Sequence, residues 1–131
     1  MGKYSETLME HFASPRNVGR LDGADRIGRA GTPGRGPFMV LYLRLSGGIV
    51  TDARYQSHGC GATIASGSVL TELILGRTVQ VCRALSSEVV REALDGVPPD
   101  KLHCPALAVA ALRSALDPQG RWPAEGEAEG G

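Results

Sequence analysis

Residues 38–76 of the chain read FMVLYLRLSGGIVTDARYQSHGCGATIASGSVLTELILG. Residues 38–45 are dense in β-branched, aromatic and aliphatic side chains, and residues 49–57 place apolar side chains among polar ones. The Ser-Gly-Gly turn signal between these two runs predicts a β-hairpin. Apolar residues at helical spacing then predict a helix over residues 62–75, which Gly76 ends.

The segment that joins the hairpin to this helix is Gly59-Cys60-Gly61, so Cys60 is predicted at a strand-to-helix junction. A cysteine binds metal or attacks as the thiolate, and the N–H groups and partial positive charge of a helix N-terminus favour that form. The flanking glycines, Gly61 above all, let an ion or a partner loop approach closely. A small residue buried in a tight turn is the simpler interpretation of Cys60, and the pattern alone leaves both open.

A second cysteine follows a histidine at the start of a strongly periodic apolar run, which predicts a helix over residues 102–116. His103 can ligate a metal or accept a proton from a thiol, and we expect it just outside the helix, on the same side as Cys104. Lys101 is expected to stabilise negative charge on a nearby sulfur. A capping or surface imidazole is the simpler interpretation of His103.

Shorter elements are expected around these, namely helices over residues 4–12, 79–85 and 86–94 and an edge strand around residues 26–30. The third cysteine, Cys82, lies in one of these short helices and is interpreted as a small buried residue. We expect one domain over residues 1–118 and a disordered tail over residues 119–131, where Pro, Gly, Glu and Ala predominate.

The composition excludes several classes of protein. Lys and Arg total 14 and Asp and Glu total 14 among 131 residues, so the formal net charge is zero. This balance gives no broad electrostatic attraction to nucleic acid or to an anionic membrane. The sequence contains no run of about 18 apolar residues, so no membrane span is predicted. The N-terminus has no apolar signal peptide, so a cytoplasmic location is expected, and an odd number of cysteines then argues against a disulfide framework.

Several motifs resemble the IscU/NifU N-terminal family in order and spacing. They are YSE at residues 4–6, His11, PRNVG at 15–19, DARY at 52–55, HGCGA at 58–62, IAS at 64–66 and VPPDKLHC at 97–104. The resemblance implies an α+β fold, with a small antiparallel sheet of about three strands, helices packed on one face and the His-Cys pair on the C-terminal helix. It also implies a scaffold on which a [2Fe-2S] cluster is built from iron and persulfide sulfur and then passed to acceptor proteins.

The family's site has three cysteines, an aspartate and a histidine, and the resemblance assigns three of these positions to Cys60, His103 and Cys104. The first cysteine and the aspartate belong to the loop before the hairpin, where this chain has Arg35 and Pro37. A guanidinium offers no lone pair to a metal at neutral pH and adds a positive charge. The resemblance therefore predicts an incomplete site.

The resemblance also implies partners. A cysteine desulfurase would deliver sulfur, and iron-sulfur acceptor proteins would receive the product. The segment by which the family contacts an Hsp70-type chaperone matches this chain at Pro98, Pro99 and Lys101, whereas Val97 and Asp100 differ from it.

Three functions follow, none of them that of an enzyme. The first is an assembly protein that binds iron, zinc or a labile [2Fe-2S] cluster through Cys60, His103 and Cys104. The second is a cluster-incompetent regulatory module that docks on a desulfurase, with Arg35 paired to the Cys104 thiolate. The third is a persulfide carrier that uses Cys104, activated by the helix start and by His103. We favour the first.

Overall fold

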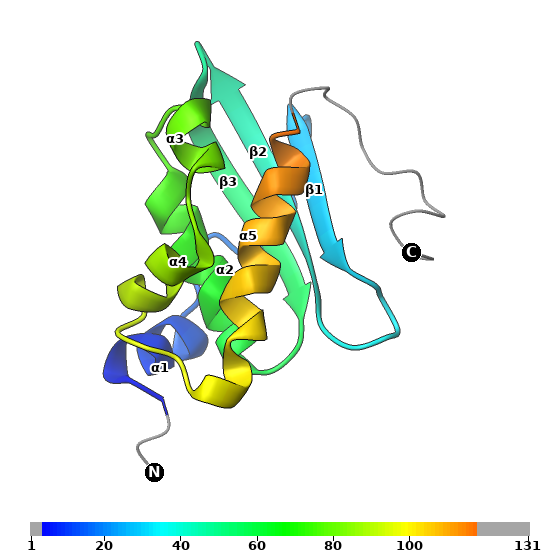
Figure 1. Cartoon of the computed structure of the whole chain (residues 1–131). Coiled ribbons are helices and arrows are strands. Elements are labelled where there is room, and N and C mark those ends of the chain that lie inside the picture. Colours follow the sequence, from blue (N-terminus) through cyan, green and yellow to red (C-terminus); the bar gives the residue numbers. More distant parts are fainter. Residues whose placement is uncertain (1–3, 118–131) are drawn as a thin grey trace.

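The predicted hairpin forms the centre of the structure, a computed structural model that describes residues 4–117 (Figure 1). Strands β2 (Phe38–Ser46) and β3 (Ile49–His58) pair in antiparallel register. Gly47 and Gly48 form the turn between the two strands with φ angles of 59° and 78°, which residues other than glycine rarely adopt. The Ser-Gly-Gly signal therefore marks the turn, and a bulge between Arg44 and Leu45 shifts the register of the rest of the pairing by one residue.

The expected edge strand is also present. Strand β1 (Arg26–Gly31) pairs antiparallel with β2, which gives the sheet order β1-β2-β3. Five helices follow the predicted ranges to within a few residues: α1 (Glu6–Ala13), α2 (Gly61–Ile74), α3 (Val79–Arg83), α4 (Ser87–Ala93) and α5 (His103–Ala115). A short 3-10 turn that was not predicted, η1 (Pro99–Lys101), precedes α5.

Helices α2 and α5 cover one face of this sheet, and in Figure 1 α5 crosses in front of β1 and β2. Side chains alternate across a strand, so Met39, Leu41 and Leu43 all point to the covered face, where they are fully buried. On β1, Gly28 lets α5 approach closely, because a Cβ there would lie 2.1 Å from the carbonyl oxygen of Ala111. The predicted α+β class, with about three antiparallel strands and helices on one face, is confirmed.

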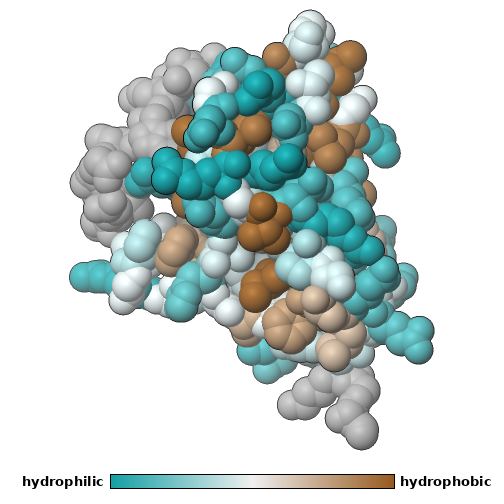
Figure 2. Space-filling view, turned by 180° about the vertical axis from the view of Figure 1, so that it is seen from behind, coloured by the Kyte–Doolittle hydropathy of each residue, from teal (hydrophilic) through white to brown (hydrophobic). Residues whose placement is uncertain are grey.

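The opposite face of the sheet carries the alternate residues, among them Arg44, Arg54 and Gln56. Figure 2 shows the molecule from that side, with hydrophilic residues over much of the surface and smaller hydrophobic patches between them. No helix within residues 4–117 is long and apolar enough to span a membrane. The tail predicted over residues 119–131 lies outside the described residues.

Helix α1 is fastened to α2 by a buried polar contact. The ring nitrogen Nδ1 of His11 lies 2.7 Å from the hydroxyl of Ser68, and the backbone N–H of Arg16 donates to the same hydroxyl at 2.9 Å. These bonds fix α1 so that the ring of Phe12 covers Gly61, at the first turn of α2. The N-terminal helix is thereby held beside the segment that carries Cys60.

A candidate metal site built on two thiols

The first turns of α2 and α5 lie at the same end of the sheet (Figure 1). Cys60 is the N-cap residue of α2 and follows β3, whereas Cys104 is the second residue of α5. Although 44 residues separate them in sequence, their sulfur atoms lie 3.8 Å apart. The structure thus brings together the two cysteines that the sequence singles out.

The two thiols differ in access to solvent. Cys104 is fully buried in the core, with no exposed surface, whereas Cys60 is half-buried at its edge. Neither forms a disulfide. A reagent or partner that approaches from solvent therefore meets Cys60 first.

Thr63 links both thiols and was not predicted. Its hydroxyl donates a hydrogen bond to the Cys104 sulfur at 3.3 Å and lies 3.8 Å from the Cys60 sulfur. Residues three apart on a helix share a face, so Thr63 returns to the side of α2 on which its N-cap residue lies. The signal was the Cys-Gly-Ala-Thr spacing itself, because a hydroxyl at the third helical position faces the N-cap.

Gly59 is required at this junction. Its φ angle is 157°, and a Cβ there would lie 2.6 Å from the hydroxyl oxygen of Thr63. At Gly61, which the sequence favoured as the more informative glycine, a Cβ would lie 3.2 Å from the ring of Phe12. Gly59 is therefore the tighter constraint, because its neighbour is the residue that links the thiols.

At both thiols, burial acts to raise the pKa and hydrogen bonds from Thr63 act to lower it. For Cys60, burial works to raise the pKa, but bonds from the backbone and side chain of Thr63 and the backbone of Ala62 outweigh it and lower the pKa to about 7. For Cys104, burial dominates and raises the pKa to about 11 against the hydrogen bond from Thr63. The expected activation of Cys104 by the helix start is wrong, and the activated thiol is Cys60.

Two further side chains reach the pair. Burial raises the pKa of Tyr4, and its phenol also makes a hydrogen bond with Cys60, which raises that pKa further. The ammonium of Lys101 acts to lower the pKa of Cys104, as expected for a cation near a thiol. The electrostatic effect predicted for Lys101 is present, whereas the sequence analysis predicted no contact between Tyr4 and the thiols.

The structure does not gather His103 with the thiols. His103 is the first residue of α5, and Leu102 before it already has helical φ and ψ angles of −64° and −21°. The expectation that His103 lies just outside the helix is therefore wrong, and its side chain is exposed. Within residues 4–117, no three His, Cys, Asp or Glu side chains are grouped closely enough to hold a metal ion.

The loop that contains Arg35 and Pro37 is largely exposed. Arg35 donates its backbone N–H to the carbonyl of Thr32 at 3.0 Å, and in the described part of the chain its side chain contacts neither thiol. The expected pairing of Arg35 with the Cys104 thiolate is not found. The loop nonetheless ends near the site, because Phe38 stacks on His58 with ring centroids 5.8 Å apart.

Cys82 lies apart from this site. It is fully buried, its sulfur lies 3.9 Å from the carbonyl oxygen of Ile74, and burial raises its pKa. Its interpretation as a small buried residue is confirmed.

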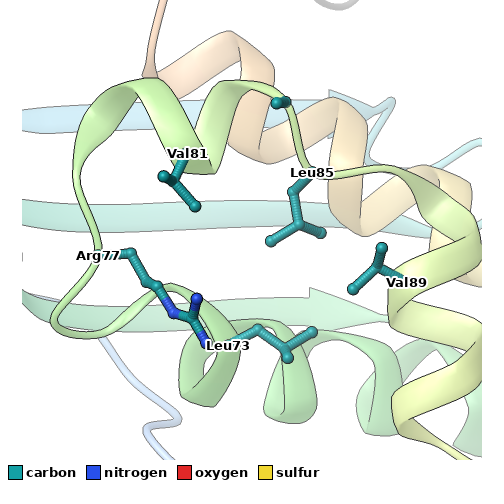
Figure 3. A pocket seen from close by; sticks show the side chains of 6 residues that line it. Leu73, Arg77, Val81, Leu85 and Val89 are labelled. Carbon is teal, nitrogen blue, oxygen red and sulfur yellow. The ribbon is translucent and has the colours of Figure 1, made fainter.

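An apolar hollow of about 320 Å³ also lies away from the thiols, between the end of α2 and helices α3 and α4. Figure 3 shows Val81, Leu85 and Val89 facing Leu73 across this hollow, with Arg77 along one side. No cysteine lines it.

Comparison with known proteins places the chain in a family. The model of the NifU-like N terminal domain matches residues 3–120. The chain is 39% identical over 113 residues to the iron-sulfur cluster assembly scaffold protein IscU 1 of Archaeoglobus fulgidus, covering 86% of this chain and 74% of that protein. It is 38% identical over 117 residues to the scaffold protein IscU of Escherichia coli K12, covering 86% of this chain and 91% of the relative.

Solved structures show the same fold. A protein from Fervidobacterium islandicum AW-1, described as an iron-sulfur cluster assembly scaffold for the SUF system, superposes with a TM-score of 0.71 at 23% identity, covering 87% of this chain and 96% of that one. A NifU-like N-terminal protein from Brucella abortus gives a TM-score of 0.58 at 21% identity, covering 91% and 81%. The resemblance seen in the sequence is confirmed: the chain belongs to the NifU-like N-terminal family and is a homologue of the IscU scaffold proteins.

Proposed function

We propose that this protein serves iron-sulfur cluster assembly and binds iron, zinc or a labile [2Fe-2S] cluster as its cargo through Cys60 and Cys104, with His103 as a third ligand. The names of its relatives support the process, since they are scaffold proteins for cluster assembly. The placement of the two thiols supports the site.

One observation carries the proposal, the separation of 3.8 Å between the Cys60 and Cys104 sulfurs. Two thiolates bound to one tetrahedral metal at about 2.3 Å each place their sulfurs about 3.8 Å apart. The pair therefore already has the spacing that a shared ion requires, and a metal would bind with little movement of either helix. Hydrogen bonds from Thr63 and the charge of Lys101 would stabilise the thiolates.

The site is open by comparison with a closed tetrahedral centre. Arg35 and Pro37 supply no ligand, and His103 must turn its exposed ring toward Cys104 to bind. Water, a partner's side chain or a second copy of the chain would complete the coordination. Three protein ligands leave one position free, so we expect bound metal to exchange readily.

The proposed partners are a cysteine desulfurase, which supplies sulfur, and the acceptor proteins that receive the cluster. An Hsp70-type chaperone is proposed to bind Pro98, Pro99 and Lys101. These residues form the turn before α5, and Lys101 also acts on the Cys104 thiol. A partner on this turn would thus contact the backbone that positions one metal ligand. No catalytic turnover by the chain itself is proposed.

Metal analysis of the protein purified without chelator, followed by zinc titration and anaerobic reconstitution with iron and sulfide, tests the proposal. We expect one zinc per chain, a visible spectrum typical of [2Fe-2S] after reconstitution, and a loss of zinc affinity of about tenfold or more for Cys60→Ser or Cys104→Ser. His103→Ala should weaken binding less than either.

The matched control is Cys82→Ser, which removes the third thiol and should leave binding unchanged. Failure of the wild-type protein to bind zinc or cluster, or an equal loss of affinity in Cys82→Ser, would show that the thiol pair is not the site.

A further inference from the structure

The apolar hollow between the end of α2 and helices α3 and α4 is open to solvent although its walls are hydrophobic (Figure 3). Val81 is 48% exposed and Val89 is 41% exposed, and both face Leu73 across the hollow. Contiguous exposed apolar surface marks a place where another group binds. At about 320 Å³ the hollow lies at the lower end of the range of about 300–1,000 Å³ that ligand pockets span, so it suits one large apolar group.

We propose that Trp122 of the same chain occupies this hollow, with the glutamates that follow it beside Arg77. Residues 121–129 read RWPAEGEAE, and Trp122 is the only tryptophan of the chain. This segment lies outside the described residues, and docking would order part of the tail that the composition predicts as disordered. The hollow lies away from the thiols, so the proposal is independent of the proposed function.

The described chain ends beside the hollow. The last turn of α5 is joined to the walls of the hollow at two points. The Arg83 side chain donates from Nε to the carbonyl of Leu116 at 2.9 Å. Arg113 donates to the carbonyl of Leu85 at 3.3 Å. Leu85 lines the hollow, as does Ala84, the residue after Arg83. The segment that follows α5 therefore starts at the rim.

The length of this segment allows Trp122 to reach the hollow. The five residues from position 117 to Trp122 span at most about 17 Å when extended and about 12 Å on average when flexible. A helix with its side chains is about 10–12 Å across, so the segment can pass round α3. Trp122 is the one large apolar side chain among residues 118–131. Docking its indole would remove roughly 150–250 Å² of surface from water.

The charges on the two sides are complementary. Within residues 4–117, the guanidinium of Arg77 makes no hydrogen bond or ion pair, although it lies along one side of the hollow (Figure 3). The two glutamates that neighbour lining residues in sequence, Glu72 and Glu88, are paired with other arginines. The segment after Trp122 supplies free carboxylates at Glu125, Glu127 and Glu129. An exposed ion pair adds little affinity, so the indole carries the binding and the charges orient the segment.

The fluorescence of the full-length protein, excited outside the tyrosine band, tests the proposal because it reports on Trp122 alone. We expect emission at a shorter wavelength than in the urea-unfolded chain. Quenching by acrylamide should be at least about threefold weaker than in the unfolded chain, because a docked indole is shielded from water. Nuclear Overhauser contacts from the indole to methyl groups of Val81, Leu85 and Val89 should locate it in the hollow.

Substitutions in the hollow separate this site from any other. Val81→Asp and Val89→Asp each place a carboxylate among the apolar walls, so each should return quenching to the unfolded value. Arg77→Glu should strengthen quenching only about twofold, because the ion pair is exposed. The matched control is Val18→Asp, at a valine that is 54% exposed and does not line the hollow, and it should behave as wild type. Circular dichroism identifies any variant that fails to fold.

Three results would overturn the proposal. The first is a wild-type protein in which Trp122 is quenched as strongly as in the unfolded chain. The second is shielding that persists in both valine-to-aspartate variants, which would place the indole elsewhere. The third is shielding that is lost on dilution, which would show that the tryptophan comes from a second copy of the chain.

Discussion

Two regions at one end of the sheet contrast sharply, the helix starts that carry the thiols and the loop over residues 32–37. The first is built into the core: Cys104 is fully buried, and Thr63 hydrogen-bonds to its sulfur. The second is mostly exposed, and the contact made by Arg35 there is a backbone bond to Thr32. The packing that stabilises the fold also positions the thiols, whereas most side chains of the loop are exposed.

This difference bears on the ligand set that the family resemblance implies, in which Arg35 and Pro37 occupy two of the ligand positions. A residue in a largely exposed loop can be replaced with little effect on the fold. Replacing a buried residue at a helix start alters the site and the fold at once. Arg35 and Pro37 in the loop are therefore compatible with an intact backbone around Cys60 and Cys104.

The largest expected effect comes from a substitution at Gly28, where β1 packs against α5, the helix that carries Cys104. An alanine there would place its Cβ 2.1 Å from the Ala111 carbonyl oxygen, so α5 must shift away from β1. We expect Gly28→Ala to lower the free energy of unfolding by about 3 kcal/mol, measured by urea denaturation.

The matched control is Gly36→Ala in the loop, where a Cβ meets nothing within 4 Å but the backbone has a φ of +101°. That strain should cost only about 1 kcal/mol. Equal losses in the two variants would contradict the contrast between the regions.

Adding the two loop ligands that the family resemblance implies tests the comparison further. Because Phe38 stacks on His58, the loop ends beside the strand that leads to Cys60. The double change Arg35→Cys with Pro37→Asp should therefore raise zinc affinity by about tenfold or more, measured by competition with a chelating dye. Arg35→Ser with Pro37→Asp is the control for loss of the guanidinium alone. No gain from the added thiol would mean that the loop lies too far from the pair.

The pH dependence of alkylation compares the thiols within the packed region. With a pKa of about 7, half of the Cys60 thiols are ionised at pH 7, against roughly one in a hundred for an ordinary thiol of pKa 9.0. Reduced nucleophilicity of the weaker base offsets part of this, which leaves roughly a five- to tenfold advantage.

Because the thiolate is the reactive form, the rate for Cys60 in metal-free protein should rise with pH and level off above pH 7. Iodoacetamide labelling followed by peptide mass spectrometry measures each cysteine separately. Cys104 should stay unlabelled in the folded protein at pH 7, since it is buried and its pKa is about 11. Faster labelling of Cys104 than of Cys60 would contradict the assignment.

The smallest effect is expected for Arg35→Ala. Its side chain is exposed and has no contact with either thiol among the described residues, so the free energy of unfolding should change by less than about 0.5 kcal/mol. Thermal unfolding measures this directly. A loss several times larger would show that the guanidinium stabilises the loop.

The sequence predicted most of the fold because its local signals agree with one another. The Gly-Gly turn, the alternation in β2 and β3, and the periodic runs of α2 and α5 each specify one element, and the elements pack as the family resemblance implies. Their bounds differ by a few residues because helix ends depend on caps and neighbouring contacts.

The site was less predictable, because its properties arise from tertiary packing. Sequence patterns placed Cys60 and Cys104 at helix starts but could not show which thiol is enclosed, and enclosure decides their pKa values. The turn η1 continues into α5 through helical backbone at Leu102, which places His103 inside the helix. The contact of Thr63 with Cys104 and that of Tyr4 with Cys60 arise only from tertiary packing.

The most direct test of the shared thiol site is X-ray absorption at the zinc edge of the zinc-loaded protein. Two sulfur ligands at about 2.3 Å, with nitrogen or oxygen completing the shell, are the predicted result, and one sulfur should be lost in either Cys60→Ser or Cys104→Ser. A shell with one sulfur or none in the wild-type protein, or one that survives both substitutions unchanged, would contradict the account.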